Sequence, residues 1–233
     1  HTDNIDNFFQ TGRTSINDIS VAGGNAQTDY RIGFNTLNSR GIVLNQNINR
    51  YGLNSNVGFK FNDKFSSRFT MNYVNSNSNG RPVQSSNNPN VLTSSVYGIP
   101  ITVDVNDLKA NYVDSFGNQN FMTTDKTGNN PFWILNKNLN GNKLNRFYGS
   151  TQFEYKATDW LTFSENFGYD MYIENRLGYN RKGTAGDLLG SYVATDIFQK
   201  RFNNDFMATA QKDINKDWFL RAMVGTNLLD RRI

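Results

Sequence analysis

The chain has 233 residues, and its 24 basic and 20 acidic side chains leave a net charge of only +4. This balance, without any basic tract, excludes the electrostatic footprint of a nucleic-acid-binding protein. Cysteine is absent and the only histidine is His1, so neither a thiol site nor a histidine-based triad can be built. The longest purely apolar run is 132–135, far shorter than the roughly 20 residues that a membrane helix needs.

Apolar residues recur at every second position in eight stretches, and this period predicts eight β-strands. The expected strands cover residues 16–23, 28–38, 51–61, 65–73, 145–156, 161–173, 198–211 and 218–227. One side of each strand is apolar and aromatic, whereas the other side is rich in Asn, Arg, Lys and Gln. The fold class is therefore predicted to be all-β and antiparallel, with two chemically different faces.

A short polar turn occurs three times, at 60–65, 156–161 and 214–219, and each copy contains Asp followed by Lys or Trp. Each copy predicts a tight β-hairpin. Longer polar connections are expected at 39–49, 76–144 and 174–196, so short and long connections alternate strictly. This alternation is typical of a transmembrane β-barrel with short periplasmic turns and long extracellular loops. The alternative is a soluble antiparallel β-sandwich, although its strands usually have only about five or six residues.

The longest connection, 76–144, is polar, but two parts of it are expected to fold. Asn88 followed by Pro89 predicts a helix start, with one apolar side. That side is formed by Val91, Leu92, Ser95 and Val96. The run 132–135 is a second apolar patch. The acidic group around Asp104 lacks the spaced ligands of a calcium loop and is expected to cap a helix instead.

The chemistry of an enzyme is not found in the sequence. There is no G-x-S-x-G elbow, no G-x-G-x-x-G and no P-loop, so no catalytic residue, cofactor or metal site is predicted. Glu154 and Glu174 are expected on the polar face or in a loop. Glu165 falls on the apolar face, where a carboxylate is costly unless it is near the interface, pairs, or meets another subunit. A local bulge that turns Glu165 to the polar face is the other explanation.

Several segments, in this order, resemble the early barrel of SusC-like TonB-dependent outer-membrane transporters, the RagA/SusC family. They are Asp6-Asn7-Phe8-Phe9-Gln10-Thr11-Gly12, Ser20-Val21-Ala22-Gly23-Gly24-Asn25, Thr28-Asp29-Tyr30-Arg31, Asn38-Ser39-Arg40-Gly41-Ile42, Ser86-Asn87-Asn88-Pro89, Asn130-Pro131-Phe132-Trp133, Thr158-Asp159-Trp160-Leu161 and Tyr172-Ile173-Glu174-Asn175-Arg176. The resemblance covers essentially the whole chain.

The resemblance implies that residues 1–233 are one part of a barrel of about 22 strands, with a long extracellular loop at about 76–144. The family's plug domain and its C-terminal barrel strands are expected to lie outside this sequence. The resemblance also implies the outer membrane of a Gram-negative bacterium as the location. The alternatives are a small eight-stranded barrel that anchors rather than transports, and a soluble β-rich binding module.

The function implied by the resemblance is uptake of a large nutrient, a glycan or a peptide, without enzymatic activity. A SusD-like surface lipoprotein would form the lid, TonB would act through the absent plug, and pairs of transporter and lipoprotein could form dimers. Candidate contacts with substrate or lid lie in the long loop. They are Arg81, Asn87, Asn88, Phe132 and Trp133. For Phe132 and Trp133 the competing interpretation is that they only anchor the loop on the rim.

Overall fold

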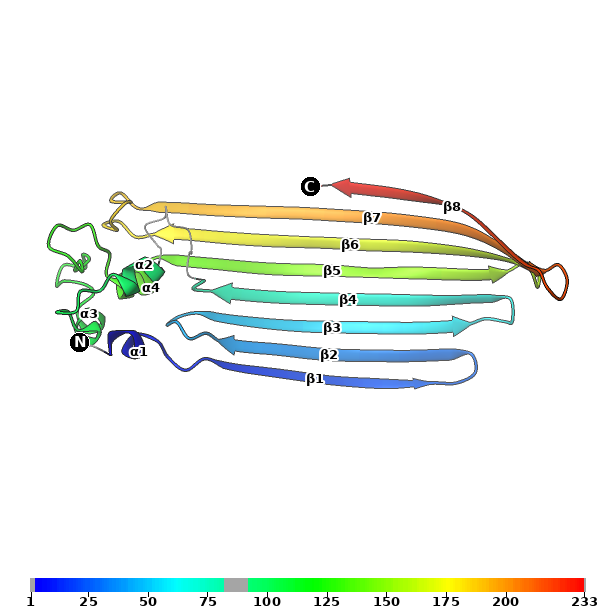
Figure 1. The fold of residues 1–233 in the computed structure, drawn as a ribbon, viewed down its shortest axis with the longest axis horizontal. Helices are drawn as coiled ribbons and strands as arrows, with labels where there is room; N and C mark the ends of the chain where they lie inside the picture. Colours follow the sequence, from blue (N-terminus) through cyan, green and yellow to red (C-terminus); the bar gives the residue numbers. More distant parts are fainter. Residues whose placement is uncertain (1–2, 82–91, 233) are drawn as a thin grey trace.

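The computed structural model describes residues 3–81 and 92–232, with the backbone alone at 93–95. Eight strands form one antiparallel sheet and neighbour one another in chain order (Figure 1). The strands are β1 Arg13–Gly24, β2 Thr28–Arg40, β3 Asn47–Lys60, β4 Phe65–Asn79, β5 Leu139–Lys156, β6 Leu161–Asn180, β7 Ser191–Asp213 and β8 Phe219–Arg232. Four short helices gather at one end of the sheet: α1 Asn4–Phe8, α2 Leu92–Tyr97, α3 Val105–Ala110 and α4 Pro131–Lys137.

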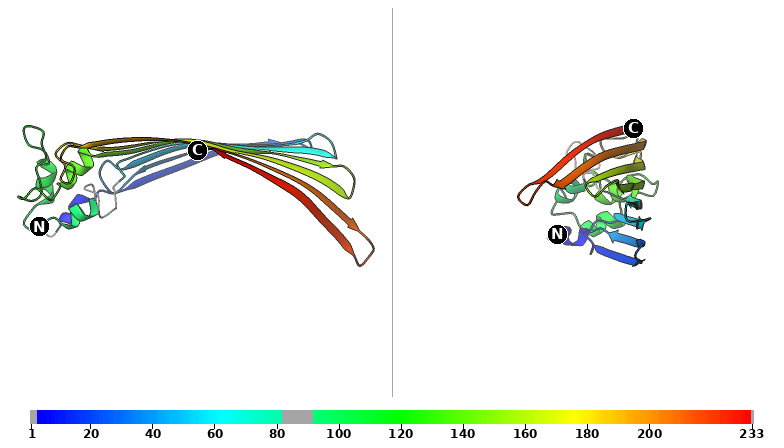
Figure 2. Two further views of the ribbon diagram at one scale, coloured as in Figure 1. Left: turned by 90° about the horizontal axis from the view of Figure 1, so that it is seen from above. Right: turned by 90° about the vertical axis from the view of Figure 1, so that its right-hand side faces the viewer.

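The sheet is open. Viewed along the strands, it forms an arc from β1 to β8 (Figure 2), and these two strands are its opposite edges. This arrangement contradicts the alternative of an eight-stranded barrel, in which β1 and β8 would pair. It also contradicts the β-sandwich, which needs a second sheet. The predicted all-β antiparallel class is confirmed.

The apolar face of the sheet is joined by aromatic side chains on successive strands. Phe59, Phe69, Phe153, Phe167 and Phe202 form a row from β3 to β7, with ring centroids 6.0–6.4 Å apart at each step. Such cross-strand pairs each contribute about 0.2–1 kcal/mol. Because the residues between them point to the other side, the row also fixes the register that separates the two faces.

The strands are longer than the sequence predicts, and the connections are shorter. The expected loops 39–49, 76–144 and 174–196 shrink to 41–46, 80–138 and 181–190, because the strands on both sides of each loop extend into it. The longest strands, β5, β6 and β7, reach 18, 20 and 23 residues. In these added segments polar side chains such as Lys143, Asn175 and Asp196 fall on the apolar face, so the alternation of apolar and polar side chains is interrupted there. Backbone hydrogen bonds do not require apolar side chains, and the ladder continues.

The short turns are all built in the same way. Asn25, Asn62 and Asn215 each accept, through Oδ1, two backbone N–H groups two and three residues ahead, at 2.8–3.0 Å. Thr158 does the same through Oγ1, at 3.4 and 3.0 Å. The predicted hairpins are confirmed, and a fourth copy of the turn is found at 25–27. The Asn or Thr that opens the turn accepts the backbone N–H groups of the turn, and the Asp that marks the repeat in the sequence is not their acceptor.

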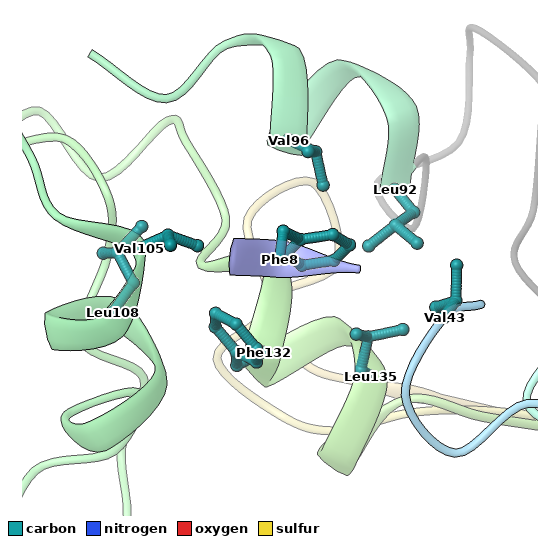
Figure 3. Close-up of a cluster of buried hydrophobic side chains, with 8 residues drawn as sticks. All are labelled: Phe8, Val43, Leu92, Val96, Val105, Leu108, Phe132 and Leu135. Atoms are coloured by element: carbon teal, nitrogen blue, oxygen red, sulfur yellow. The ribbon is translucent and has the colours of Figure 1, made fainter. Parts of the chain in front are cut away.

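The opposite end of the sheet carries a small folded unit, which we call the loop body: residues 3–12, 41–46, 92–138 and 181–190. Its hydrophobic core joins all four helices and the 41–46 connection (Figure 3). The core side chains are Phe8, Val43, Leu92, Val96, Val105, Leu108, Phe132 and Leu135. None of the helices in the described part of the chain is long and apolar enough to cross a membrane.

Two helix starts in the loop body follow from short polar side chains. Asp104 caps α3 and accepts the backbone N–H of Asn106 at 2.8 Å, which confirms the predicted cap. Asn130 caps α4 in the same way, with Pro131 at the first helical turn. The expected helix near 88–96 is present as α2, in which Leu92 and Val96 are buried, but its predicted cap at Asn88 lies outside the described residues.

Candidate functional site

The polar face of the sheet holds three clusters of charged side chains. One lies beside the loop body, one midway along the strands and one at the short turns. Each cluster is placed by the period of two along the strands, because cross-strand partners on one face lie directly opposite each other.

The cluster beside the loop body is centred on Glu174 of β6. Its carboxylate accepts two hydrogen bonds from Arg176, at 2.8 and 2.9 Å, and one from the Asn142 amide of β5, at 2.7 Å. The side chain of Glu174 is only 13% exposed, whereas that of Arg176 is 57% exposed. These residues line a hollow of about 470 Å³, and Arg81 and Asn140 line it too. The site therefore offers guanidinium N–H groups to a ligand while the carboxylate stays held.

The middle cluster is an ion pair with an aromatic support. Arg146 donates from Nε and Nη2 to both oxygens of Asp170, at 2.9 and 2.8 Å, and its guanidinium lies 4.8 Å from the ring centre of Tyr148. Arg201 of β7 is directly opposite Asp170 in the register. A bidentate pair of this kind fixes the plane of the guanidinium group, so the pair is a rigid polar element of this face of the sheet.

At the end with the short turns, Arg68 makes two hydrogen bonds with Asp29, at 3.0 and 2.9 Å, and a third with the Asn56 amide oxygen. The pair borders a hollow of about 440 Å³, which Glu154 and Lys156 also line. In the turn itself, Lys60 holds the pKa of Asp63 below its ordinary value through a hydrogen bond and its charge.

The structure places the predicted contact residues in different environments. Arg81 is exposed at the hollow beside Glu174, and its carbonyl accepts a hydrogen bond from Asn140 at 3.3 Å. Phe132 and Trp133 are 2% and 0% exposed, within the loop body. Their burial supports the anchoring interpretation rather than direct contact with a ligand. Asn87 and Asn88 lie outside the described residues.

Trp133 anchors the loop body through a buried polar contact that the sequence did not predict. Its indole Nε1 donates to Thr184 Oγ1 at 2.9 Å, which joins the 80–138 connection to the 181–190 connection. Nearby, Gln119 donates to Asn129 Oδ1 at 2.9 Å, and Asn129 bonds the backbone of Ala185 in both directions, at 2.8 and 3.1 Å. Two long connections thus form one ordered unit at this end of the sheet.

Carboxylates in the loop body stabilise turns. The pKa of Asp114 is lowered mainly by the backbone N–H of Asn118, and that of Asp125 mainly by the hydroxyl of Thr123. The pKa of Asp187 is lowered by hydrogen bonds from Ser191 and Asn180. Across the described residues, no three His, Asp or Glu side chains gather in a way that could hold a metal ion.

Glu165 remains on the apolar face. The ladders on both sides of it are continuous, with Phe153 and Phe206 directly opposite, so the bulge considered from the sequence is wrong. The carboxylate accepts a hydrogen bond from the Asn204 amide of β7, which is on the same face. A neighbouring amide, which the sequence did not identify, therefore partners the carboxylate on this face.

No protein-family model matches the sequence, and no curated protein matches it either. Solved structures are nevertheless similar in fold. A structure of the RagAB peptide transporter is 16% identical with a TM-score of 0.76, and the RagAB peptide importer in its closed-closed state is 16% identical with a TM-score of 0.74. Each match covers 98% of this chain and 25% of the other.

The open form of the ferric-catecholate import receptor Fiu from E. coli K12 is also similar, at 13% identity and a TM-score of 0.54, over 94% of this chain and 32% of the receptor. The present chain thus spans about a quarter to a third of the length of these proteins. The comparisons confirm, for the fold, the resemblance to TonB-dependent transporters: the open antiparallel sheet has the fold of one section of such a protein.

Proposed function

We propose that the chain is a section of the barrel wall of a SusC-like TonB-dependent transporter, which imports a large nutrient across the outer membrane of a Gram-negative bacterium. The observation that carries the proposal is the fold, which matches the RagAB peptide importers over 98% of the chain. The nutrient is proposed to be a peptide or a glycan. A peptide is favoured because these structural relatives are named as peptide importers and because paired charges line the polar face.

The two faces of the sheet suit this location. The apolar face carries exposed aliphatic and aromatic side chains and would contact lipid, while the polar face would line the interior of the barrel. Trp160 and Trp218 are 46% and 70% exposed at the short turns, as expected for side chains at a membrane interface. The strands, at 12–23 residues, exceed the about 9–11 that cross a bilayer, so they would extend beyond it toward the loop body.

The open edges support a wall that further strands complete. An unpaired row of N–H and C=O groups is not tolerated in hydrocarbon, because no water is present to bind them. The edges at β1 and β8 would therefore each pair with another strand of the same barrel. Residues 1–233 would then be a partial barrel domain, with the plug that TonB contacts contributed by other parts of the protein.

The loop body and the hollow beside Glu174 would receive the substrate. The loop body is ordered by its own core, and Arg176 lines the hollow at the same end of the sheet. We assign contact with substrate to Arg81 and Arg176, and keep Asn87 and Asn88 as candidates for contact with substrate or lid. Phe132 and Trp133 hold the loop in place. A SusD-like surface lipoprotein would cover this end, and pairs of the two proteins could associate as dimers.

The test is to extract the native polypeptide from isolated outer membranes in detergent and to measure its intact mass and its co-purifying proteins. The expected result is a chain several times heavier than 26.5 kDa, together with a surface lipoprotein. Uptake of a labelled peptide or glycan by cells should also require TonB. A mature chain of 26.5 kDa in the membrane would instead support an anchoring protein, and recovery from the soluble fraction would support a binding module.

A further inference from the structure

The apolar face of the sheet changes character next to the loop body. On β1 and β2 the apolar positions are Ile19, Val21, Ile32 and Phe34, all 44–68% exposed. At the loop-body end of the same two strands, the same face carries arginine. Arg13 of β1 and Arg40 of β2 are directly opposite each other in the register, so both side chains are on the face that carries the apolar residues.

Two like charges directly opposite on neighbouring strands repel each other, and the arrangement is destabilising unless an anion is present. Arg40 donates a hydrogen bond to the Gln10 side-chain oxygen, which leaves its charge uncompensated. Within the described part of the chain, neither arginine forms an ion pair, and no Asp or Glu occurs on this face of β1, β2, β3 or β4. The missing partner is therefore an anion from outside these strands.

The two arginines line a hollow of about 760 Å³ on this face. The other polar side chains of the hollow on the same face are Ser15, Asn38, Asn47 and Asn49. These groups can both donate and accept hydrogen bonds, as hydroxyl groups of a sugar require.

We propose that this hollow binds the phosphate-bearing sugar head group of a membrane glycolipid. The head group would occupy the arginines and asparagines, while the acyl chains would lie along Ile19, Val21, Ile32 and Phe34 on the same two strands. The order of the two surfaces matches the order of the two parts of such a lipid: charged at the rim, apolar toward the short turns. Two guanidinium groups provide the forked donors that phosphate oxygens accept best.

The inference depends on the membrane placement in the proposed function, and the experiment separates the two. The whole native protein is extracted from outer membranes and transferred to phosphate-free detergent. Bound lipid is then measured by native mass spectrometry and by phosphorus content. The test variant is Arg13→Gln with Arg40→Gln. The matched control is Arg31→Gln with Arg50→Gln, which removes the same charge from the polar face of β2 and β3.

We expect the wild type and the control to retain a phosphorylated glycolipid, and the test variant to retain about tenfold less. The variant Arg13→Lys with Arg40→Lys keeps the charge and should retain an intermediate amount. It also provides a folded comparison if the glutamine variant is poorly assembled. When the glycolipid is added to the detergent micelles, the wild type should bind it again. The same glycolipid without its phosphate should not bind.

Equal lipid retention in the test variant would overturn the proposal. It would also fail if inorganic phosphate alone displaced the lipid completely, because the acyl chains would then contribute nothing. Occupation of the face by a protein in place of lipid would overturn it as well. If the native protein were not in the outer-membrane fraction at all, the proposed function would fail first.

Discussion

At the scale of single residues, the contact between Trp133 and Thr184 holds two distant connections together, and its loss should loosen the loop body. Thr184→Val keeps the shape of the side chain but leaves the indole N–H unsatisfied in a fully buried position. The expected cost is about 1–3 kcal/mol. Hydrogen exchange should therefore become faster at 129–138 and 181–190. The control is Thr195→Val, because Thr195 is exposed on β7. Unchanged protection in both segments would show that the contact is not needed.

Asp187 makes the 181–190 connection sensitive to acid. Its folded-state pKa is lowered by hydrogen bonds from Ser191 and Asn180, at 2.6 and 2.9 Å. A depressed pKa stabilises the folded connection above the ordinary carboxyl pKa of about 3.9, and this stabilisation is lost as pH falls through the folded value. Proteolysis of this connection should accelerate below about pH 4 in the wild type. In Asp187→Asn this acceleration of proteolysis at low pH should be absent. An identical pH profile in the variant would assign the acid sensitivity to another group.

Arg176 is the exposed partner of a held carboxylate, so its remaining guanidinium N–H groups are available to an incoming ligand. Arg176→Gln should raise the substrate concentration needed for half-maximal uptake about tenfold, since arginine is one of the residues enriched among binding hot spots. Arg221→Gln removes an equal charge from the polar face of β8, near the short turns, and should leave uptake unchanged. A change in electrophoretic mobility between unheated and heated samples would confirm that both variants are folded. Normal uptake by Arg176→Gln would exclude the hollow beside Glu174 from binding.

At the scale of elements, the short turns depend on one polar side chain each. Asn62 accepts the backbone N–H groups of Lys64 and Phe65, both at 2.9 Å, whereas Asp63 is 95% exposed and only pairs with Lys60. Asn62→Ala should therefore lower the free energy of unfolding by about 1 kcal/mol, whereas Asp63→Ala should lower it by less, because the ion pair of Asp63 is exposed to solvent. Urea unfolding of the whole protein in detergent, followed by tryptophan fluorescence, measures both. The opposite ranking would mean that the Asp stabilises the turn.

The sequence predicted the elements whose side chains alternate in polarity, and it missed what depends on backbone pairing or on distant contacts. All eight strands and the three repeated turns could be found, because residues such as Phe153 and Phe167 mark one face. The ends of β5, β6 and β7 could not, since residues such as Lys143, Asn175 and Asp196 put polar groups on the apolar face there while the ladder continues. Likewise, α4 could have been predicted from Asn130 and Pro131, the same signal used at 88–89.

The candidate site was predicted only in part for a related reason. Arg81 was predicted to be a contact with substrate or lid in the long loop, and it lines the hollow beside Glu174. The partners Asn142 and Arg176 come from strands whose ends had been taken for loops, so their alignment on one face could not be deduced. Aromatic residues in a polar loop resemble a binding surface in sequence, but Trp133 is buried. Its partner Thr184 is 51 residues away in the chain, so the contact between them could not be deduced from the sequence.

At the scale of the whole molecule, the chain exposes more surface than a compact protein of its size. Its accessible surface is 15307 Å², whereas a compact monomer of 26.5 kDa is expected to expose about 11,000 Å². The excess follows from a single curved sheet with two uncovered faces, held at one end by the loop body. Such a sheet would be stabilised by lipid on one face and by further strands at β1 and β8.

This surface predicts how the 233-residue chain behaves when it is produced alone. Large apolar side chains cover one face and both edges are open, so the chain in water should aggregate, while detergent should keep it dispersed. Size-exclusion chromatography with and without detergent measures the difference. The matched comparison is the whole native protein, which should elute as one species in detergent. If the isolated chain were monodisperse in water and unfolded cooperatively, its apolar face would not need lipid, and the assignment of that face to a membrane would be wrong.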